Sequence, residues 1–280
     1  MLWSVVDRGV SDFVFSGLEL IGFPLKKWGI SPITASLPGV SSPTPLIIWI
    51  VIYLSIVLTG VTINRKVATA DRSEKLWLKI FVQAHNLVLI SLSSYMSFGT
   101  AFLAWTYGYR FWGNPYKVEE VSMGNMIYVF YMSKWYEFFD TFIMLLKGNT
   151  RQVSFLHVYH HVSISFIWWM IAYSAPGGDA YYSCFLNSFV HVVMYTYYLL
   201  AAIVGKDAKK RRKYLWWGQY LTMFQMAQFV SMLVQSIYVS KFSSYPKPIA
   251  DLLFYYMQTL LVLFAHFFMK KYLRNGKKAD

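Results

Sequence analysis

The chain has 280 residues, of which 56% are hydrophobic, 20% aromatic and only 14% charged, a makeup that excludes an ordinary soluble domain and predicts a membrane protein. It carries 26 Lys and Arg against 13 Asp and Glu, and few of these charges fit inside apolar spans. We therefore expect the basic excess in short loops and tails, facing phosphate groups of lipids or of a cofactor. Nucleic acid is not an expected partner of a chain that lies mostly in lipid.

Residues 1–44 form an N-terminal segment without a clear signal peptide, because charged residues such as Asp7 and Asp12 interrupt its apolar residues. Its prolines end any helix before the first apolar stretch. We expect this segment to lie along the bilayer surface.

Seven apolar stretches follow, each close to the ~20 residues that cross the hydrocarbon core of a bilayer. They are residues 45–63, 80–103, 125–146, 153–173, 182–203, 215–239 and 250–269. The prediction is an all-α fold in which residues 45–270 form one domain with seven transmembrane helices. Residues 271–280 are then a tail.

Lysine and arginine are unequally divided between the two sides of these predicted spans. Of the 26, one side carries 18, the other carries seven, and Lys134 lies within a span. Because basic residues are retained on the cytosolic side, the tail is predicted to be cytosolic and the N-terminus lumenal. The C-terminal Lys277-Lys278-Ala279-Asp280 resembles the dilysine retrieval signal of endoplasmic reticulum membrane proteins, with a simple basic anchor as the alternative.

Three of the six histidines, His157, His160 and His161, lie within five positions. On a helix, His157 lies beside both of the others, since residues three and four apart share a face. An imidazole can act as base, acid, nucleophile or metal ligand. This histidine box alone therefore leaves catalysis by protons, by a covalent intermediate or by a metal open.

Ionisable residues inside a predicted span are costly and usually mark a functional site. The third predicted span holds Lys134, Glu137 and Asp140, which share an arc of about 120° on a helix. We expect Lys134 to pair with Glu137, and Asp140 to orient an imidazole. An ion pair with a purely structural role is the alternative.

Two later spans carry polar residues on one helical face. They are Asn187, His191, Met194, Tyr195 and Tyr198 in the fifth span, and Thr222, Gln225 and Gln228 in the sixth. Helical rise places these residues, the box and the charged residues within about 20 Å of the predicted cytosolic ends. We expect four helices to converge on one site, with apolar room beyond it for a long substrate. Interhelical hydrogen bonding is the simpler alternative for any single residue.

Several functions fit these residues. Histidine boxes of this type occur in membrane di-iron desaturases and hydroxylases, but those need more histidines than the six of this chain. A single-metal hydrolase, or a seven-span lipid transporter or receptor, is a further alternative. The last is metal-free acyl transfer, in which an imidazole attacks a thioester and a carbon nucleophile intercepts the acyl-imidazole. Cys184, the only cysteine, lies far from the box, so a histidine would have to serve.

Four motifs in order carry a resemblance to a known family. They are Lys134-x-x-Glu137-x-x-Asp140-Thr141, Gln152 to His161, Asn187-x-x-x-His191-x-x-Met194-Tyr195-x-x-Tyr198 and Thr222-x-x-Gln225-x-x-Gln228. Residues 45–270 resemble the very-long-chain fatty acid elongases, the membrane 3-ketoacyl-CoA synthases. The stretches 130–134, 151–154 and 175–178 are most similar to algal and moss enzymes that elongate polyunsaturated chains.

The resemblance implies seven membrane helices, six of which enclose a narrow tunnel. It implies an acyltransferase that joins a long-chain acyl-CoA, polyunsaturated and C18 to C20 in length, to malonyl-CoA. The products would be 3-ketoacyl-CoA, CO2 and CoA, with no metal or cofactor required. The reductases and dehydratase of the elongation cycle, and a second copy of this chain, are the protein partners that it suggests.

The resemblance also implies a role for each site residue. His160 would carry the acyl group, with Asp140 and His157 orienting it and His161 moving protons. His191 and Asn187 would stabilise the developing negative charge. The remaining substrate-binding residues would be Lys134, Glu137, Tyr195, Tyr198, Gln225, Gln228 and Arg151. Basic residues at the cytosolic rim would bind CoA phosphates or act only as topology signals, namely Arg65, Lys66, Arg151, Lys209 and Arg212.

Overall fold

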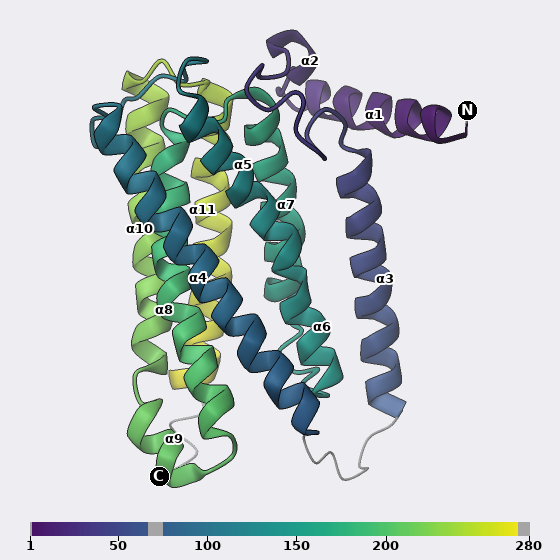
Figure 1. Ribbon diagram of the computed structural model, residues 1–280, viewed down its shortest axis with the longest axis vertical. Coiled ribbons are helices and arrows are strands. Elements are labelled where there is room, and N and C mark those ends of the chain that lie inside the picture. Colours follow the sequence, from purple (N-terminus) through teal and green to yellow (C-terminus); the bar gives the residue numbers. More distant parts are fainter. Residues whose placement is uncertain (1, 67–74, 274–280) are drawn as a thin grey trace. The chain divides into compact units, whose positions relative to one another are not determined.

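The computed structural model describes residues 2–66 and 75–273, and the regular secondary structure of these residues is entirely helical (Figure 1). The chain divides into two compact units, each with its own packing. The first unit contains residues 1–72 and 115–180, and the second contains residues 73–114 and 181–280.

The helices of the first unit come from two separate parts of the chain. They are α1 (Leu2–Leu20), α2 (Leu25–Trp28), α3 (Thr44–Lys66), α5 (Val121–Tyr136), α6 (Phe138–Leu146) and α7 (Phe155–Ser174). The helices of the second unit are α4 (Leu76–Thr106), α8 (Ala180–Val204), α9 (Ala208–Tyr214), α10 (Gly218–Phe242) and α11 (Lys247–Phe268), followed by a short π-helix η1 (Met269–Leu273).

Four helices of the described part are long and apolar enough to cross a bilayer, namely α3, α4, α8 and α11. They coincide with the first, second, fifth and seventh predicted spans, so the chain is a helical multi-pass membrane protein. Two further predicted spans form α7 and α10, which are long enough to cross a bilayer but are not among these four. Seven spans, six of them around a tunnel, and the domain boundaries at residues 44 and 270 stay predictions.

The third predicted span is not one helix, and the prediction of a continuous helix over residues 125–146 is wrong at Glu137. Helix α5 ends at Tyr136 and α6 begins at Phe138. The amide of Asp140 donates to the carbonyl of Glu137, three residues earlier, which is a tighter turn than an α-helix makes. The indole of Trp49 in α3 donates to the carbonyl of Trp135 at 3.4 Å, which helps to satisfy the backbone at the junction.

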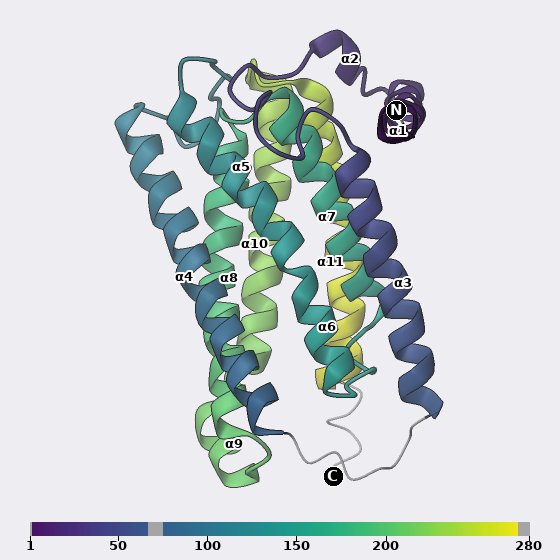
Figure 2. The same cartoon turned by 45° about the vertical axis from the view of Figure 1, so that its right-hand side comes forward.

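The N-terminal segment forms a long helix, α1, that lies crosswise to α3 (Figures 1 and 2). Phe15 of α1 is buried, with its ring centroid 5.8 Å from that of Trp169 and 5.4 Å from that of Tyr173 in α7. The segment after α2 covers the end of α7. Its Thr34 hydroxyl donates to the carbonyl of Ala172 at 2.6 Å, satisfying an acceptor that the helix end leaves open.

The second unit is held by helix pairs. In the α10–α11 pair, the rings of Phe229 and Phe264 lie 4.9 Å apart, and the Ser240 hydroxyl donates to Asp251 at 2.6 Å. The Thr100 hydroxyl of α4 lies 3.4 Å from the sulfur of Cys184 in α8, so the only cysteine is a buried packing residue. The predicted dilysine, Lys277 and Lys278, lies outside the described residues.

Candidate active site

The histidine box occupies the first two turns of α7. Ser154 precedes the helix in an extended conformation, and its hydroxyl accepts a hydrogen bond from the amide of His157 at 3.3 Å. A serine in this position stabilises a helix start by satisfying one of its free amide groups. This cap fixes where α7 begins, and therefore which histidines share a face.

The three imidazoles lie close together. The ring centroids of His157 and His161 are 4.4 Å apart, and those of His160 and His161 are 5.7 Å apart. The predicted contact of His157 with His161 is thus confirmed. His161 is buried, and its Nδ1 atom has no hydrogen-bond partner among the described residues. A buried nitrogen without a partner is costly, which makes His161 a candidate for contact with a substrate atom.

A chain of hydrogen bonds from two other helices reaches the box. The Nε2 atom of His157 lies 2.8 Å from the hydroxyl of Thr141 in α6. That hydroxyl lies 3.0 Å from the hydroxyl of Tyr53 in α3. Both Thr141 and Tyr53 are fully buried, and the ring of Tyr53 stacks on Phe138 with centroids 4.2 Å apart.

The direction of these bonds follows from the number of protons available. Tyr53 has no other hydrogen-bond acceptor among the described residues, so its proton is donated to Thr141. If Tyr53 donates, the Thr141 proton is available to Nε2 of His157, an arrangement in which His157 carries its own proton on Nδ1. Sequence reasoning missed Tyr53. The only sequence signal was a tyrosine within an apolar span.

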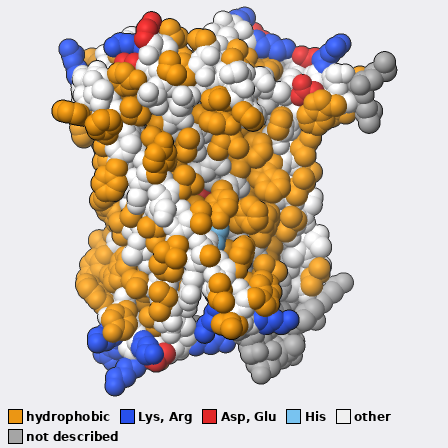
Figure 3. Space-filling view, viewed as in Figure 1, with side chains coloured by type: hydrophobic (Ala, Val, Ile, Leu, Met, Phe, Trp, Pro, Cys, Tyr) orange, Lys and Arg blue, Asp and Glu red, His pale blue; other side chains and the backbone are white. Residues whose placement is uncertain are grey.

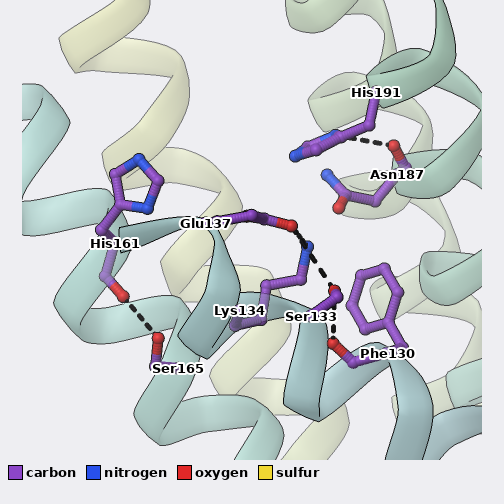
Figure 4. Close-up of polar contacts among 8 residues, drawn as sticks. All are labelled: Phe130, Ser133, Lys134, Glu137, His161, Ser165, Asn187 and His191. Carbon is purple, nitrogen blue, oxygen red and sulfur yellow. Dashed lines mark hydrogen bonds and ion pairs between the residues drawn. The ribbon is translucent and has the colours of Figure 1, made fainter. Parts of the chain in front are cut away.

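A buried ion pair lies at the junction of α5 and α6. The Nζ atom of Lys134 is 2.5 Å from Oε1 of Glu137, and both side chains are almost fully buried, so the predicted pairing is confirmed (Figure 4). The ammonium group also lies 4.0 Å from the ring centroid of Phe130, a cation–π contact. The Ser133 hydroxyl lies 3.5 Å from Oε1 of Glu137 and donates to the carbonyl of Phe130 at 2.7 Å.

Asp140 lies in the first turn of α6, where the positive end of the helix dipole stabilises a carboxylate. It is half-buried. The hydrogen bond that reaches the His157 imidazole comes from Thr141, the next residue of the same motif. A role for Asp140 in orienting an imidazole stays a prediction.

The second unit carries its polar residues along α8 and α10. Nδ1 of His191 donates to the carbonyl of Asn187 at 2.8 Å, which leaves Nε2 of His191 as the nitrogen directed away from its own helix backbone (Figure 4). The ring of Tyr195 contacts both His191 and Tyr198, at centroid distances of 5.7 and 5.9 Å. The ring contacts confirm that His191, Tyr195 and Tyr198 share a face of α8.

Two glutamines of α10 also have sulfur partners in the second unit. The amide group of Gln225 donates to the sulfur of Met194 at 3.4 Å, and that of Gln228 donates to Met232 at 3.9 Å. Since the box and the Lys134–Glu137 pair belong to the first unit, the convergence of all these residues on one site stays a prediction.

The predicted rim residues differ in what the structure describes. Arg151 in the loop before α7, and Lys209 and Arg212 in α9, are exposed. The side chains of Arg65 and Lys66 lie outside the described part of the chain. Exposed basic groups of this kind fit a phosphate-bearing ligand and also a topology signal.

No three His, Cys, Asp or Glu side chains within residues 2–66 and 75–273 are arranged to hold one metal ion. The imidazoles of the box contact each other and a threonine hydroxyl. The absence of a metal from the reaction stays a prediction.

Comparison with known proteins assigns the chain to a family. Residues 38–280 match the model of the ELO family, described as the GNS1/SUR4 family. This chain belongs to the ELO family. The two motifs that hold the ion pair and the histidine box lie inside the matched region, and so do the polar stripes of α8 and α10.

The relatives of this ELO-family chain include proteins named as fatty acid elongases. It is 37% identical over 250 residues to fatty acid elongase 6 of Leishmania major, covering 85% of this chain and 62% of that protein. It is 33% identical over 244 residues to very long chain fatty acid elongase 5 of Tachysurus fulvidraco, covering 84% of this chain and 78% of that protein. It is 33% identical over 207 residues to very long chain fatty acid elongase 2 of Mus musculus, covering 72% and 69%. Similarity to algal and moss enzymes in particular stays a prediction.

Proposed function

We propose that this chain is a membrane acyltransferase, a very-long-chain 3-ketoacyl-CoA synthase, which condenses a long-chain acyl-CoA with malonyl-CoA. Its membership of the ELO family and the names of its relatives support this proposal. The observation that carries it is the contact among His157, His160 and His161 at the start of α7. Such a cluster supplies a nucleophile together with neighbours that can move its protons.

The first step is the transfer of the acyl group to His160. A ring nitrogen of His160 attacks the thioester carbon, the carbon–sulfur bond breaks, and CoA leaves as a thiolate. The proton lost from the acylated imidazole passes through His161 to the thiolate. His157 is suited to orient His160, because Thr141 and Tyr53 hold its ring from two other helices.

The second step forms the carbon–carbon bond. Malonyl-CoA loses CO2, and the resulting carbanion attacks the carbonyl carbon of the acyl-imidazole. The carbon–nitrogen bond breaks, 3-ketoacyl-CoA is released, and the freed nitrogen of His160 takes up a proton. Both steps balance without a metal, a redox cofactor or any co-substrate beyond the two CoA thioesters.

The other polar side chains have supporting roles in this proposal. His191 and Asn187 stabilise the oxyanion and the enolate, and Asp140 helps to orient and polarise His160. The Lys134–Glu137 pair mainly holds the junction of α5 and α6. Substrate contacts are assigned to Tyr195, Tyr198, Gln225, Gln228 and Arg151, the last of them to CoA phosphate.

The proposal extends to location and substrate. Seven spans would place the N-terminus in the lumen and the C-terminus in the cytosol of the endoplasmic reticulum membrane, as the distribution of basic residues predicts. A tunnel among six of the helices would take a polyunsaturated chain of C18 to C20. The reductases and dehydratase that process 3-ketoacyl-CoA are suitable neighbours in the same membrane, and a homodimer is a further element of the proposal.

One experiment tests the nucleophile. The purified protein is incubated with acyl-CoA alone, and free CoA and the intact protein mass are measured. The wild-type protein should release CoA and gain the mass of one acyl group, whereas His160→Ala should do neither. His266→Ala is the matched control, because it removes an exposed imidazole outside the box and should acylate normally. An acylated His160→Ala protein would overturn the assignment.

Two further measurements address the reaction and its alternative. Mass spectrometry of the products from a panel of acyl-CoAs with malonyl-CoA should show 3-ketoacyl-CoA and the preferred chain length. Metal analysis of active protein addresses the di-iron reading, and stoichiometric iron in active protein would reject the metal-free mechanism.

A further inference from the structure

Helix α1 carries an exposed apolar stripe along its whole length. Its members recur three and four positions apart, so they share one face of the helix. The most exposed are Trp3, Val6, Phe13 and Leu20, with exposed fractions of 58%, 42%, 81% and 87%. Val10 and Gly17 continue the same face between them. A continuous stripe of this kind is unfavourable in water and indicates a partner surface.

Two other flanks of α1 contact described residues of the first unit. Phe15 and Leu18 are buried against the first unit. The acidic flank faces α2, where Lys26 lies 2.9 Å from Asp12 and Lys27 lies 2.6 Å from Glu19. Both carboxylates therefore have a cation beside them, whereas the side chains of the apolar stripe are exposed.

The position of α2 orients the stripe relative to the membrane helix of the same unit. In Figure 2, α2 lies on the far side of α1 from the body of α3, so the acidic flank faces away from α3. The stripe lies about 140° around the helix from Asp12 and Glu19 at 100° per residue. The stripe therefore faces the side of α1 on which α3 begins, opposite to the side of α2.

The surface beside the stripe is also apolar. Helix α3 is apolar enough to cross a bilayer, and near its first turns Val51 and Ile52 are 57% and 41% exposed. Figure 3 shows charged side chains on the outer edge over α1 and α2, with hydrophobic side chains beneath them. The exposed side chains of α1 and of α3 thus form one continuous apolar surface, although the two helices lie crosswise to each other.

We propose that α1 is an interfacial membrane anchor, whose stripe enters the boundary between lipid headgroups and acyl chains at the end of α3. A helix that lies crosswise to a spanning helix is parallel to the bilayer plane, and an apolar stripe beside a charged flank is the pattern of interfacial helices. Trp3 at one end of the stripe is of the residue type enriched at this boundary. The partner is a lipid surface, and the anchor sets the depth of the first unit in the bilayer.

Spin labels at two neighbouring positions test this proposal in the full-length chain in lipid nanodiscs. Gly17→Cys places the label on the stripe, where an added Cβ atom meets nothing within 4 Å. Ser16→Cys is the matched control, because Ser16 is also exposed but lies about 100° around the helix. Cys184, buried in α8, is replaced by alanine in both. A single peak in size-exclusion chromatography shows that each variant is folded.

The label at position 17 should collide with dissolved oxygen but be protected from an aqueous nickel chelate, with a several-fold lower nickel accessibility than the label at position 16. Equal nickel accessibility at both positions would overturn the proposal. Spin–spin broadening at position 17 that disappears on dilution with unlabelled protein would assign the stripe to a second copy of the chain and would also overturn it. Leu20→Cys repeats the test at a second stripe position.

Discussion

The Nε2 atom of His157 lies 2.8 Å from the hydroxyl oxygen of Thr141. This bond joins α7 to α6, and the bond from Tyr53 extends it to α3. Three helices of the first unit are therefore joined through the hydroxyl of Thr141. Because Thr141 bonds to both of the other side chains, it is the residue whose removal should disturb the box most directly.

Thr141→Val keeps the shape of the side chain but removes the hydroxyl. It leaves the buried hydroxyl of Tyr53 and Nε2 of His157 without partners, so we expect a loss of about 1–3 kcal/mol in stability and reduced condensing activity. Thermal unfolding in detergent and formation of 3-ketoacyl-CoA measure the two effects. Thr141→Ser keeps the hydroxyl and should restore most of both. A valine variant that matches the wild-type protein would show that the bond has no role.

Tyr53→Phe removes the hydroxyl that donates to Thr141, while the ring still stacks on Phe138. Thr141 can then either donate to His157 or accept from it, so the Nδ1–H tautomer should no longer be enforced. We expect 15N chemical shifts of His157 to move from one tautomer toward a mixture, with a smaller loss of activity than in Thr141→Val. The exposed Tyr220→Phe is the control. Unchanged shifts in Tyr53→Phe would contradict the proposed proton direction.

Lys134→Met should be more damaging than the loss of the whole ion pair. The single substitution leaves the buried carboxylate of Glu137 without its cation, for which a cost of about 3–5 kcal/mol is expected. The double variant Lys134→Met/Glu137→Gln removes both charges and should recover part of that loss in thermal unfolding. Lys209→Met, at an exposed site, should change stability little. Equal stability of the single and double variants would argue against a coupled pair.

Gly124 marks a close approach of α5 to the segment that covers α7. An added Cβ atom would lie 2.6 Å from Cγ2 of Ile33 and 3.2 Å from the carbonyl oxygen of Pro176. Gly124→Ala should therefore destabilise the protein by about 1–3 kcal/mol, as overpacking does. Gly9→Ala is the matched control in α1, where a Cβ meets nothing within 4 Å and alanine should stabilise the helix by about 0.5–1 kcal/mol. Thermal unfolding of both variants gives the comparison, and a stable Gly124→Ala protein would refute the close packing.

The attachment of α1 should depend on pH through Asp7. Hydrogen bonds from the hydroxyls of Ser42 and Thr44 lower the pKa of the Asp7 carboxyl from its usual value. A lowered pKa means that the stabilisation is complete above the ordinary carboxyl pKa and is lost as the pH falls through the lowered value. Hydrogen–deuterium exchange of α1 should therefore be slow and constant near neutral pH and should rise in acid. Asp7→Asn should remove this pH dependence, and a variant that keeps it would show that another group is responsible.

Local spacing in the sequence determined much of this site. The ion pair of Lys134 and Glu137 and the contact of His157 with His161 each join residues three or four positions apart, so a helix brings them together whatever surrounds it. Ser154 ahead of the apolar stretch fixed the start of that helix in the same way. The apolar stretches of about 20 residues determined that the chain forms helices in a membrane, because a helix of that length crosses the hydrocarbon core with its own backbone hydrogen bonds satisfied.

The tertiary structure alone decided the contacts between helices. The bonds from Tyr53 to Thr141 and from Thr141 to His157 require a particular rotation and depth of three helices, which no period within one helix encodes. The break at Glu137 likewise arises where a buried ion pair and a hydrogen bond from Trp49 compete with the regular helix. Helix α1 has two apolar faces, and the tertiary structure decided that the face with Phe15 and Leu18 is the buried one. Side-chain patterns give the faces of a helix, whereas packing selects the face that is buried.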